Sequence, residues 1–397
     1  MLERICITRD TTLDAARPLN IGEIAESMLY YGNVRVIVDE AGLNQLIRDI
    51  PYNDLLRALS QGFLEVTYVK SMMAIHTENT GTENELHRPV AISIPSIQFP
   101  DLLDKAFQLT GLSLDRAQSR RRAISRYFEK SNIDARAIDA VKADIENSKF
   151  LERVVPTILR GLTKTGPPQT DVEFYVRKSG EFYVVDSNIE FEKLRVGSTN
   201  GAATESPESK MAQLLVKLAK AREVLSWSSI YDADLKSDSE SEMILEAQLN
   251  PVLARSVHNE QQISTLTSTT LEGRNISDAV NSGRRTFGEV LDLLAAAAQF
   301  KNWISGRAND AILLADYVAE IDRISWIESV PTKSLRWVLL LAGGTTMAVT
   351  GEPLIAATIT TAVLTGFDQL LVERLFRGWR PNQFVHRHLS PFVDPEE

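Results

Sequence analysis

Short runs of β-branched residues alternate with helical apolar patterns over the first hundred positions of the chain. The strand-like runs lie at residues 4–8, 34–38, 64–69, 72–77 and 90–94. Between the first three runs, apolar side chains recur at helical spacing over residues 21–31, 42–50 and 53–62. Because such alternation is typical of a partly parallel sheet, we predict a small α/β module over residues 1–98.

The middle of the chain changes to a helical pattern and then to a hairpin. Residues 99–164 carry the helical pattern, and residues 171–186 alternate apolar and polar side chains around Ser179 and Gly180. A glycine readily supplies the positive φ angle of a tight hairpin turn. We therefore expect helices plus a β-hairpin over residues 99–194, with a third strand at 188–192.

A stretch of small and polar residues, 195–209, has the composition of a linker or an exposed loop. Helical patterns follow it at residues 211–225, 241–256, 285–305 and 309–329. The Thr-rich residues 259–275 fit either a strand or a loop. Residues 210–397 are thus predicted to form a mostly helical domain, and the whole chain a multi-domain α+β protein.

The most apolar part of the chain lies within residues 332–377, which we interpret as a helical hairpin with Glu352 at its tip. Its apolar halves are shorter than the roughly 20 residues that a membrane-spanning helix needs. A buried hairpin is therefore favoured, and insertion into a membrane after a trigger is the alternative. The residues that would enter the membrane are Trp337, Leu340, Gly344, Ala348, Ile355 and Ile359.

The tail at residues 376–393 interleaves arginines with aromatic side chains. Pro381 and Pro391 argue against one continuous helix, because proline lacks the amide hydrogen that a helix interior uses. The tail either packs back on the helical domain in extended form or serves as a docking strap for a partner.

The composition is that of an ordinary globular protein. Among its 397 residues, 44% are hydrophobic and 24% are charged, and the formal net charge is −10. That charge opposes general nucleic-acid binding. One cysteine, Cys6, lies in an apolar strand and is expected to be an inert buried thiol. The charged N-terminus does not resemble a signal peptide, so a cytoplasmic location is predicted, with membrane association on activation.

Motifs for phosphate binding, nucleophilic catalysis and metal binding are weak or missing. The chain has neither a Walker A sequence nor a Gly-rich dinucleotide motif after a strand. The pair His386 and His388 lacks an evident third ligand, and the acidic residues 232–243 lack the glycine and glutamate of a calcium loop. We therefore expect no cofactor and no metal, and a solvated acidic loop at 232–243.

Acidic residues follow two of the N-terminal strands: Asp10 comes after the first, and Asp39 and Glu40 come after the second. Carboxylates gathered at strand ends can hold Mg²⁺ for phosphodiester hydrolysis. Strand ends are also where polar loop and cap residues normally occur. A metal-dependent nuclease that uses these three residues is therefore a minor alternative.

One segment is strongly basic, and its candidate binding residues are Arg116, Arg120, Arg122, Arg126 and Lys130. Helical spacing would place Arg122, Arg126 and Lys130 on one stripe. Such a face could hold nucleic-acid phosphates, an anionic membrane or an acidic partner. A solvated or internally paired face is the favoured interpretation, so nucleic acid is not the expected partner.

Together these patterns favour a non-enzymatic intracellular interaction or regulatory protein. Its α/β module would recognise a ligand or a protein partner, and its helical C-terminal domain would carry assembly. The alternatives are an effector that inserts residues 332–377 into a membrane, and the metal-dependent nuclease.

Overall fold

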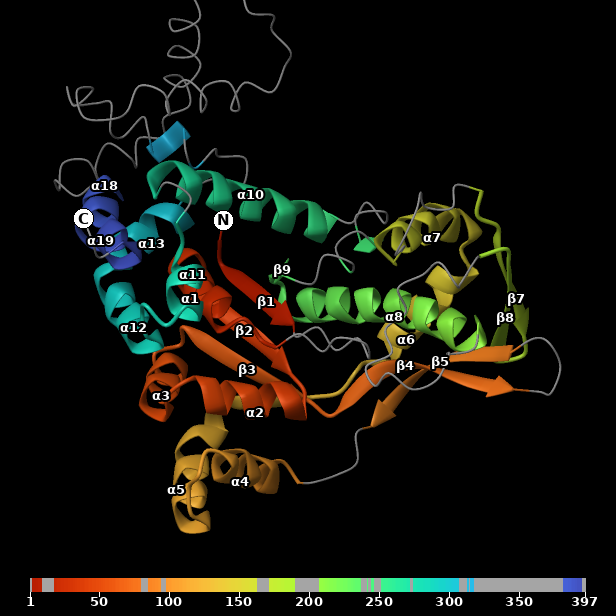
Figure 1. Ribbon diagram of the computed structural model, residues 1–397, viewed down its shortest axis with the longest axis horizontal. Helices are drawn as coiled ribbons and strands as arrows, with labels where there is room; N and C mark the ends of the chain where they lie inside the picture. The colour runs from red at the N-terminus through yellow and green to blue at the C-terminus, as the bar shows by residue number, and fades with distance from the viewer. Residues whose placement is uncertain are drawn as a thin grey trace, which may run out of the picture. The chain divides into compact units, whose positions relative to one another are not determined.

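The computed structural model describes most of the chain N-terminal to residue 307 and a short C-terminal segment (Figure 1). The described residues are 2–8, 18–79, 85–93, 98–162, 171–189, 207–236, 241, 244–245, 251–271, 274–306, 313, 315–317 and 381–394. They mix helices with two β-sheets, so the protein belongs to the predicted α+β class. Contacts divide the chain into two compact units, Leu2–Asn259 and Glu260–Glu397.

A parallel sheet of five strands forms one part of the first unit. Its strands are β1 (Arg4–Thr8), β2 (Asn33–Val38), β3 (Leu64–Val69), β6 (Phe128–Ser131) and β9 (Asp234–Lys236). They lie side by side in the order β6-β3-β2-β1-β9, and every pairing is parallel. The strand order reverses at β1, and all five carboxyl ends lie at the same edge of the sheet. In open α/β sheets this edge is where ligands bind.

Helices that follow the first strands carry the apolar patterns seen in the sequence. They are α1 (Ile21–Tyr30), α2 (Glu40–Asp49), α3 (Tyr52–Ser60), α4 (Phe99–Leu109) and α5 (Leu114–Ile124). Asn20 accepts a hydrogen bond from the Glu23 amide and so caps α1. The Phe99 ring at the start of α4 packs against Tyr68 of β3 and Phe128 of β6, with ring centroids 5.1 and 5.9 Å apart. These contacts hold α4 on the sheet.

A second, antiparallel sheet continues directly from the first. After β3 the chain passes Lys70 and enters β4 (Ser71–Asn79). The other strands are β5 (Glu85–Ser93), β7 (Phe174–Ser179) and β8 (Phe182–Ser187), and the order is β4-β5-β8-β7. The β7–β8 hairpin confirms the predicted one, with Gly180 at φ +63° in its turn. Helices α6 (Ala135–Glu146) and α7 (Ser148–Leu162) join the parallel sheet to this hairpin.

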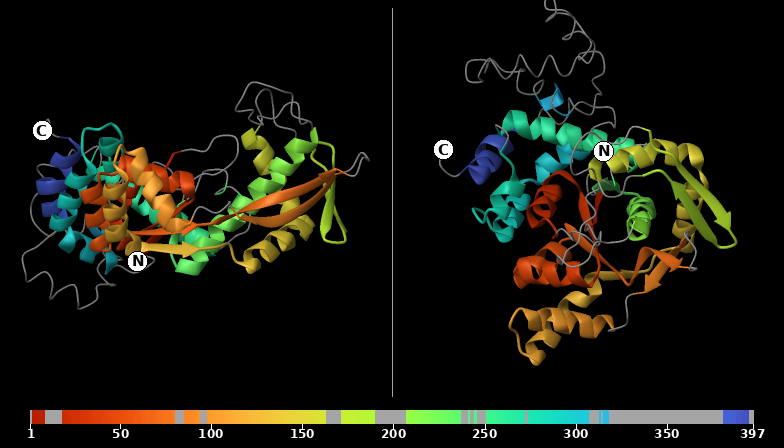
Figure 2. Two further views of the ribbon diagram at one scale, coloured as in Figure 1. Left: turned by 90° about the horizontal axis from the view of Figure 1, so that it is seen from below. Right: turned by 45° about the vertical axis from the view of Figure 1, so that its right-hand side comes forward.

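The long helix α8 (Pro207–Tyr231) connects the cores of the two sheets (Figure 2). Leu214, Leu215 and Leu218 are buried in a core shared with α6, α7 and the antiparallel sheet. Nearer its C-terminal end, Trp227 packs on Ile37 and Val69 of the parallel sheet. One helix thus supplies side chains to both cores, and its last turns lie at the junction between the sheets.

The unit Glu260–Glu397 is helical in its described part. It contains the end of α10 (Pro251–Thr270), α11 (Ile276–Asn281), α12 (Phe287–Ala296) and α13 (Ala298–Ser305). The C-terminal helices α18 (Pro381–Phe384) and α19 (Ser390–Val393) flank a π-helical turn, Val385–Leu389. Arg285 donates hydrogen bonds to the Phe392 carbonyl at 2.7 Å and the Pro391 carbonyl at 2.8 Å. Phe300 of α13 stacks on Phe384 at 4.9 Å.

Two strands contradict the sequence-based expectations. Residues 128–131 form β6 rather than the end of a helix, because buried Phe128 pairs with β3 at the sheet edge. Residues 234–236 form β9 rather than a solvated acidic loop. Asp234 is buried there because Asn259 donates to its carboxylate at 2.6 Å. Both strands depend on partners far away in the sequence, which local patterns do not reveal.

Three further expectations were wrong. Residues 259–270 are helical rather than strand or loop, since they continue α10. The helix predicted at 285–305 is interrupted at Ala297, between α12 and α13. The tail packs back on the helical unit, which was one of the two alternatives, but it does so as helical turns rather than as an extended segment. Pro381 and Pro391 both lie in the first turn of a short helix, where proline is tolerated.

Several predicted features lie outside the described residues. These include the apolar hairpin at 332–377 and most of the predicted strand at 188–192, of which Asn188 and Ile189 are described and are not in a strand. Within the part of the chain that the structure describes, no helix combines the length and apolar character needed to cross a membrane. The domain limits predicted near residues 98, 194 and 210 remain predictions.

Candidate ligand-binding site

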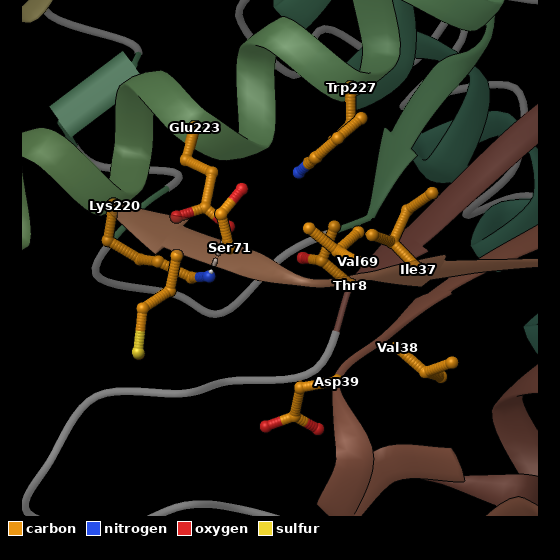
Figure 3. Close-up of a pocket in the computed structure, with 10 residues that line it drawn as sticks. Thr8, Ile37, Val38, Asp39, Val69, Ser71, Lys220, Glu223 and Trp227 are labelled. Atoms are coloured by element: carbon orange, nitrogen blue, oxygen red, sulfur yellow. Dashed lines mark hydrogen bonds and ion pairs between the residues drawn. The ribbon is translucent and has the colours of Figure 1, made fainter. Parts of the chain in front are cut away.

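A pocket lies where the carboxyl ends of β1, β2 and β3 meet the last turns of α8 (Figure 3). The empty space in and in front of it, much of it open to solvent, amounts to about 440 Å³. Its polar lining consists of Thr8, Asp39, Ser71, Lys220, Glu223 and Trp227. The apolar wall comes from Ile37, Val38, Val69 and Met72. The pocket therefore has the mixed lining of a small-molecule site at the expected edge of an α/β sheet.

A buried ion pair forms one side of this pocket. The Lys220 ammonium lies 3.0 Å from Oε1 of Glu223, one turn further along α8, and the two side chains are 11% and 7% exposed. The other carboxylate oxygen, Oε2, accepts from the Met73 amide at 3.1 Å. Burial of a charge is tolerated when it is paired and hydrogen-bonded. This pair therefore fixes α8 to the start of β4 and largely neutralises the Lys220 charge.

Trp227 contributes a hydrogen-bond donor that has no partner among the described residues. Its side chain is 2% exposed, and the buried Nε1 atom lacks an acceptor there. Figure 3 shows the ring nitrogen pointing away from α8, toward the space beside Glu223, Ser71 and Thr8. Leaving a buried donor unpaired costs about 1–3 kcal/mol. A ligand with an acceptor atom at this place would remove that cost on binding.

The strand ends supply the opposite side of the site. Oδ1 of Asp39 accepts from the Gly42 amide at 2.7 Å, so Asp39 caps α2. The Ser71 hydroxyl oxygen accepts from the Ile133 amide at 2.9 Å, and its own hydrogen can still be donated. Thr8 ends β1. The site thus offers both donors and acceptors from the ends of β1 and β2 and from the start of β4.

The charges of the site disfavour an anionic ligand. Asp39 and Glu223 bring two negative charges and Lys220 brings one positive charge. The N-terminus of α2 would attract a phosphate, but the Asp39 carboxylate already occupies one of its free amides. Phosphate would therefore meet a carboxylate at the helix end that normally binds it. The pocket fits an uncharged or cationic polar molecule.

Of the three acidic residues predicted from the sequence, the two that the structure describes, Asp39 and Glu40, have different surroundings. Asp10 lies outside the described residues. Asp39 lines the pocket, whereas the Glu40 carboxylate pairs with the Lys105 ammonium at 3.0 Å. The described residues contain no group of three His, Cys, Asp or Glu side chains arranged to hold a metal ion. Burial raises the pKa of Cys6 to about 12, so its thiol stays protonated at neutral pH.

The residues on α8 were missed in the sequence. Lys220, Glu223 and Trp227 are spaced i, i+3 and i+7, which places them on one helix face. The predicted helix covered residues 211–225, so it contained Lys220 and Glu223 but not Trp227. Local spacing did not reveal that Glu223 contacts β4.

The residues of the predicted basic face do not all lie on one helix, as the sequence had suggested. Arg116, Arg120 and Arg122 lie on α5, but that helix ends at Ile124. Arg126 lies in a short 3-10 turn, and Lys130 lies in β6, so the predicted single stripe through Arg122, Arg126 and Lys130 was wrong. The six membrane-insertion candidates, Trp337, Leu340, Gly344, Ala348, Ile355 and Ile359, lie outside the described residues.

Comparisons with known proteins identified no relative of this chain. No protein-family model matches the chain, and neither a curated protein nor a solved structure matches it.

Proposed function

We propose that this protein is a non-enzymatic regulatory protein that recognises a small uncharged ligand in the pocket at the ends of β1, β2 and β3. The Trp227 donor, which lacks an acceptor among the described residues and lies beside the buried Lys220–Glu223 pair, is the observation that carries this proposal. The helical C-terminal part would carry assembly with a protein partner.

The chemistry of the lining defines the ligand class. Trp227 requires a carbonyl oxygen, a hydroxyl oxygen or a ring nitrogen as acceptor. Asp39 can accept from hydroxyl or amino groups, and the apolar wall suits a flat or compact body. Nucleosides combine these groups without a formal charge, so they are the probe class that matches the pocket.

Binding rather than catalysis agrees best with the polar groups of the pocket. Both carboxylate oxygens of Glu223 already accept from Lys220 and Met73. Asp39 is engaged as the cap of α2. Neither carboxylate is thus arranged as an open base beside a nucleophile. The nuclease alternative would need Asp10 and a metal ion in addition, and the membrane alternative would need the hairpin at 332–377.

The proposal is tested by titrating adenosine, guanosine, cytidine and uridine into the full-length protein, with calorimetry and thermal denaturation as readouts. At least one nucleoside should bind and raise the melting temperature, and its 5′-monophosphate should bind more weakly because of the negative charge of the site. If no nucleoside binds, or if the monophosphate binds more tightly, the ligand assignment is wrong.

The Trp227→Phe variant keeps an aromatic ring but removes the donor. Loss of one hydrogen bond should weaken nucleoside binding by about 2- to 10-fold. Trp303→Phe, a buried tryptophan in the unit Glu260–Glu397, is the matched control and should leave binding unchanged. Equal affinities for the Trp227→Phe variant and the unmodified protein would contradict the role of the indole donor.

A further inference from the structure

Five cationic side chains on and beside α5 have no carboxylate partner in the described part of the chain. They are Arg116, Arg120, Arg122, Arg126 and Lys130, which together we name the α5 basic face. Arg121 differs, because it lies 3.1 Å from Asp104 of α4 and is only 24% exposed. The ion pair between α4 and α5 thus involves Arg121, whereas the other cations lack a carboxylate partner among the described residues.

The cations of the α5 basic face are mostly exposed. Arg116, Arg122, Arg126 and Lys130 are exposed, and Arg120 is half-buried. Arg116 and Arg120 are one helical turn apart, whereas Arg122 lies two residues after Arg120 and projects from another side of α5. Such closely spaced like charges repel one another, so a polyanion that contacts several of them lowers their free energy. The face is basic on a protein whose overall charge is −10, which marks it as a local feature.

Aromatic rings accompany these cations. The Arg120 guanidinium lies 4.4 Å from the ring centroid of Tyr52, and that of Arg126 lies 4.7 Å from the ring of Tyr127. Arg126 also donates a hydrogen bond to the Tyr127 hydroxyl at 2.6 Å. Guanidinium planes and tyrosine rings both offer flat surfaces on which a nucleobase can stack.

We propose that the α5 basic face binds single-stranded nucleic acid through its phosphates and unstacked bases. The phosphates of a flexible single strand can contact several of these exposed cations, and free bases can stack beside Tyr52 and Tyr127. In a duplex the bases are already stacked on one another, so these rings would contribute little. Single strands are therefore expected to bind more tightly than duplex DNA.

An anionic membrane is the competing partner with the same charge. Leu109 and Leu114 flank the turn between α4 and α5, and they are 66% and 49% exposed. They would enter a membrane surface if one were bound. The two arginine–tyrosine contacts favour nucleic acid, because they provide stacking surfaces that lipid headgroups do not use.

The test is fluorescence anisotropy with a labelled 20-nucleotide single strand, as DNA and as RNA, and with the matching duplex. The full-length protein should bind at least one single strand at 50 mM salt. If about four phosphates are neutralised, the logarithm of affinity should fall with the logarithm of salt concentration at a slope of about −3. Affinity would then drop roughly 50-fold between 50 and 200 mM salt.

The Arg122→Gln/Arg126→Gln variant should weaken binding about tenfold or more and make the salt slope shallower. Arg136→Gln/Arg153→Gln removes the same charge from exposed positions on α6 and α7, and it should retain binding. Tyr127→Leu separates stacking from charge: it should weaken binding with little change in the salt slope. Melting temperatures of all variants check that they fold.

Three results would overturn the proposal. They are undetectable single-strand binding at 50 mM salt, equal losses for the two double variants, and binding to liposomes of phosphatidylcholine with one quarter phosphatidylserine in the absence of single-strand binding. In the last case the exposed leucines and the basic face would together form a membrane-binding surface.

Discussion

Two sets of cationic side chains in the same unit have opposite surroundings. Lys220 is enclosed beside the pocket and has a carboxylate at 3.0 Å. The cations of the α5 basic face lie at the surface without such a partner in the described residues. A buried charge needs compensation inside the protein because water does not solvate it. An exposed charge is solvated, so it remains available for an external anion.

This difference distinguishes a charge that stabilises the fold from the charges that we propose bind an external anion. The Lys220–Glu223 pair is a fixed part of the fold, and its near neutrality makes the pocket suited to an uncharged ligand. The α5 basic face contributes little to folding and is suited to a polyanion. The following predictions test this distinction, beginning with the charge that should matter most for stability.

Removing one partner of the buried pair should have the largest effect. Glu223→Gln can still accept from the Met73 amide, but it leaves the Lys220 ammonium buried without a countercharge. Breaking a buried pair in this way costs about 3–5 kcal/mol. We therefore expect the free energy of unfolding, measured by urea denaturation, to fall by about that amount.

A second substitution distinguishes pairing from general damage. Lys220→Met in the Glu223→Gln background removes the uncompensated charge and should restore most of the lost stability. If the double variant is as unstable as Glu223→Gln alone, Lys220 and Glu223 are not energetically coupled.

The pair between α6 and α8 should give an intermediate effect. Arg222 donates from Nε to Oδ2 of Asp144 at 2.7 Å, and the side chains are 22% and 13% exposed. Asp144→Asn should lower the free energy of unfolding by about 1.5–3 kcal/mol, the range for hydrogen bonds to charged groups. Asp139→Asn, on the same helix, breaks the exposed contact to Lys142 and should cost less than about 1 kcal/mol. If both variants lost the same free energy of unfolding, burial would not determine how much these ion pairs stabilise the fold.

Acidification should reveal the cost of charging a buried histidine. Burial lowers the pKa of His87, whose Nδ1 lies 3.0 Å from the Thr77 hydroxyl. The unfolded chain therefore binds this proton more readily, and stability should fall as the pH drops below about 6.5. The slope from this one group is at most about 1.4 kcal/mol per pH unit.

The His87→Gln variant should lose this part of the pH dependence in urea denaturation between pH 7 and pH 5. His76→Gln, on the neighbouring strand β4, controls for replacement of a histidine in the same sheet. An unchanged slope in His87→Gln would exclude His87 as its source.

The smallest effect is expected at the surface. Arg116→Gln/Arg122→Gln removes two exposed cations that have no carboxylate partner among the described residues, so the free energy of unfolding should change by no more than about 0.5 kcal/mol per site. A loss well above 1 kcal/mol in urea denaturation would show that these arginines stabilise the fold, and the contrast with Lys220 would disappear.

Much of the fold could be predicted from local patterns. The runs at 4–8 and 64–69 coincide with β1 and β3, and the alternation around Gly180 gave the β7–β8 hairpin. These elements were predictable because the apolar residues that form the buried face of each one lie within a few positions of one another in the sequence. The end of α5 at Ile124 was not predictable, because it depends on the pairing of Phe128 in β6 with β3, about 60 residues earlier in the sequence.

The candidate site was predictable only in part. Asp39 follows a strand and was singled out for that reason, although its carboxylate caps α2 rather than joining a metal site. Glu223 was not singled out, because its role depends on the Met73 amide 150 residues away. Trp227 lies two residues beyond the helical pattern predicted at 211–225, and a tryptophan there by itself indicates only a core residue.

Sequence alone determined the α+β class, the positions of most helices and strands of the first unit, and the presence of a basic segment. These properties follow from side-chain periodicity and charge, which are local. Only the tertiary structure decided that β9 completes the parallel sheet, that α8 brings Lys220, Glu223 and Trp227 to the strand ends, and that the α5 basic face lacks carboxylate partners in the described residues. Those properties depend on contacts between residues up to 230 positions apart, such as Ile5 with Asp234, and no local pattern encodes them.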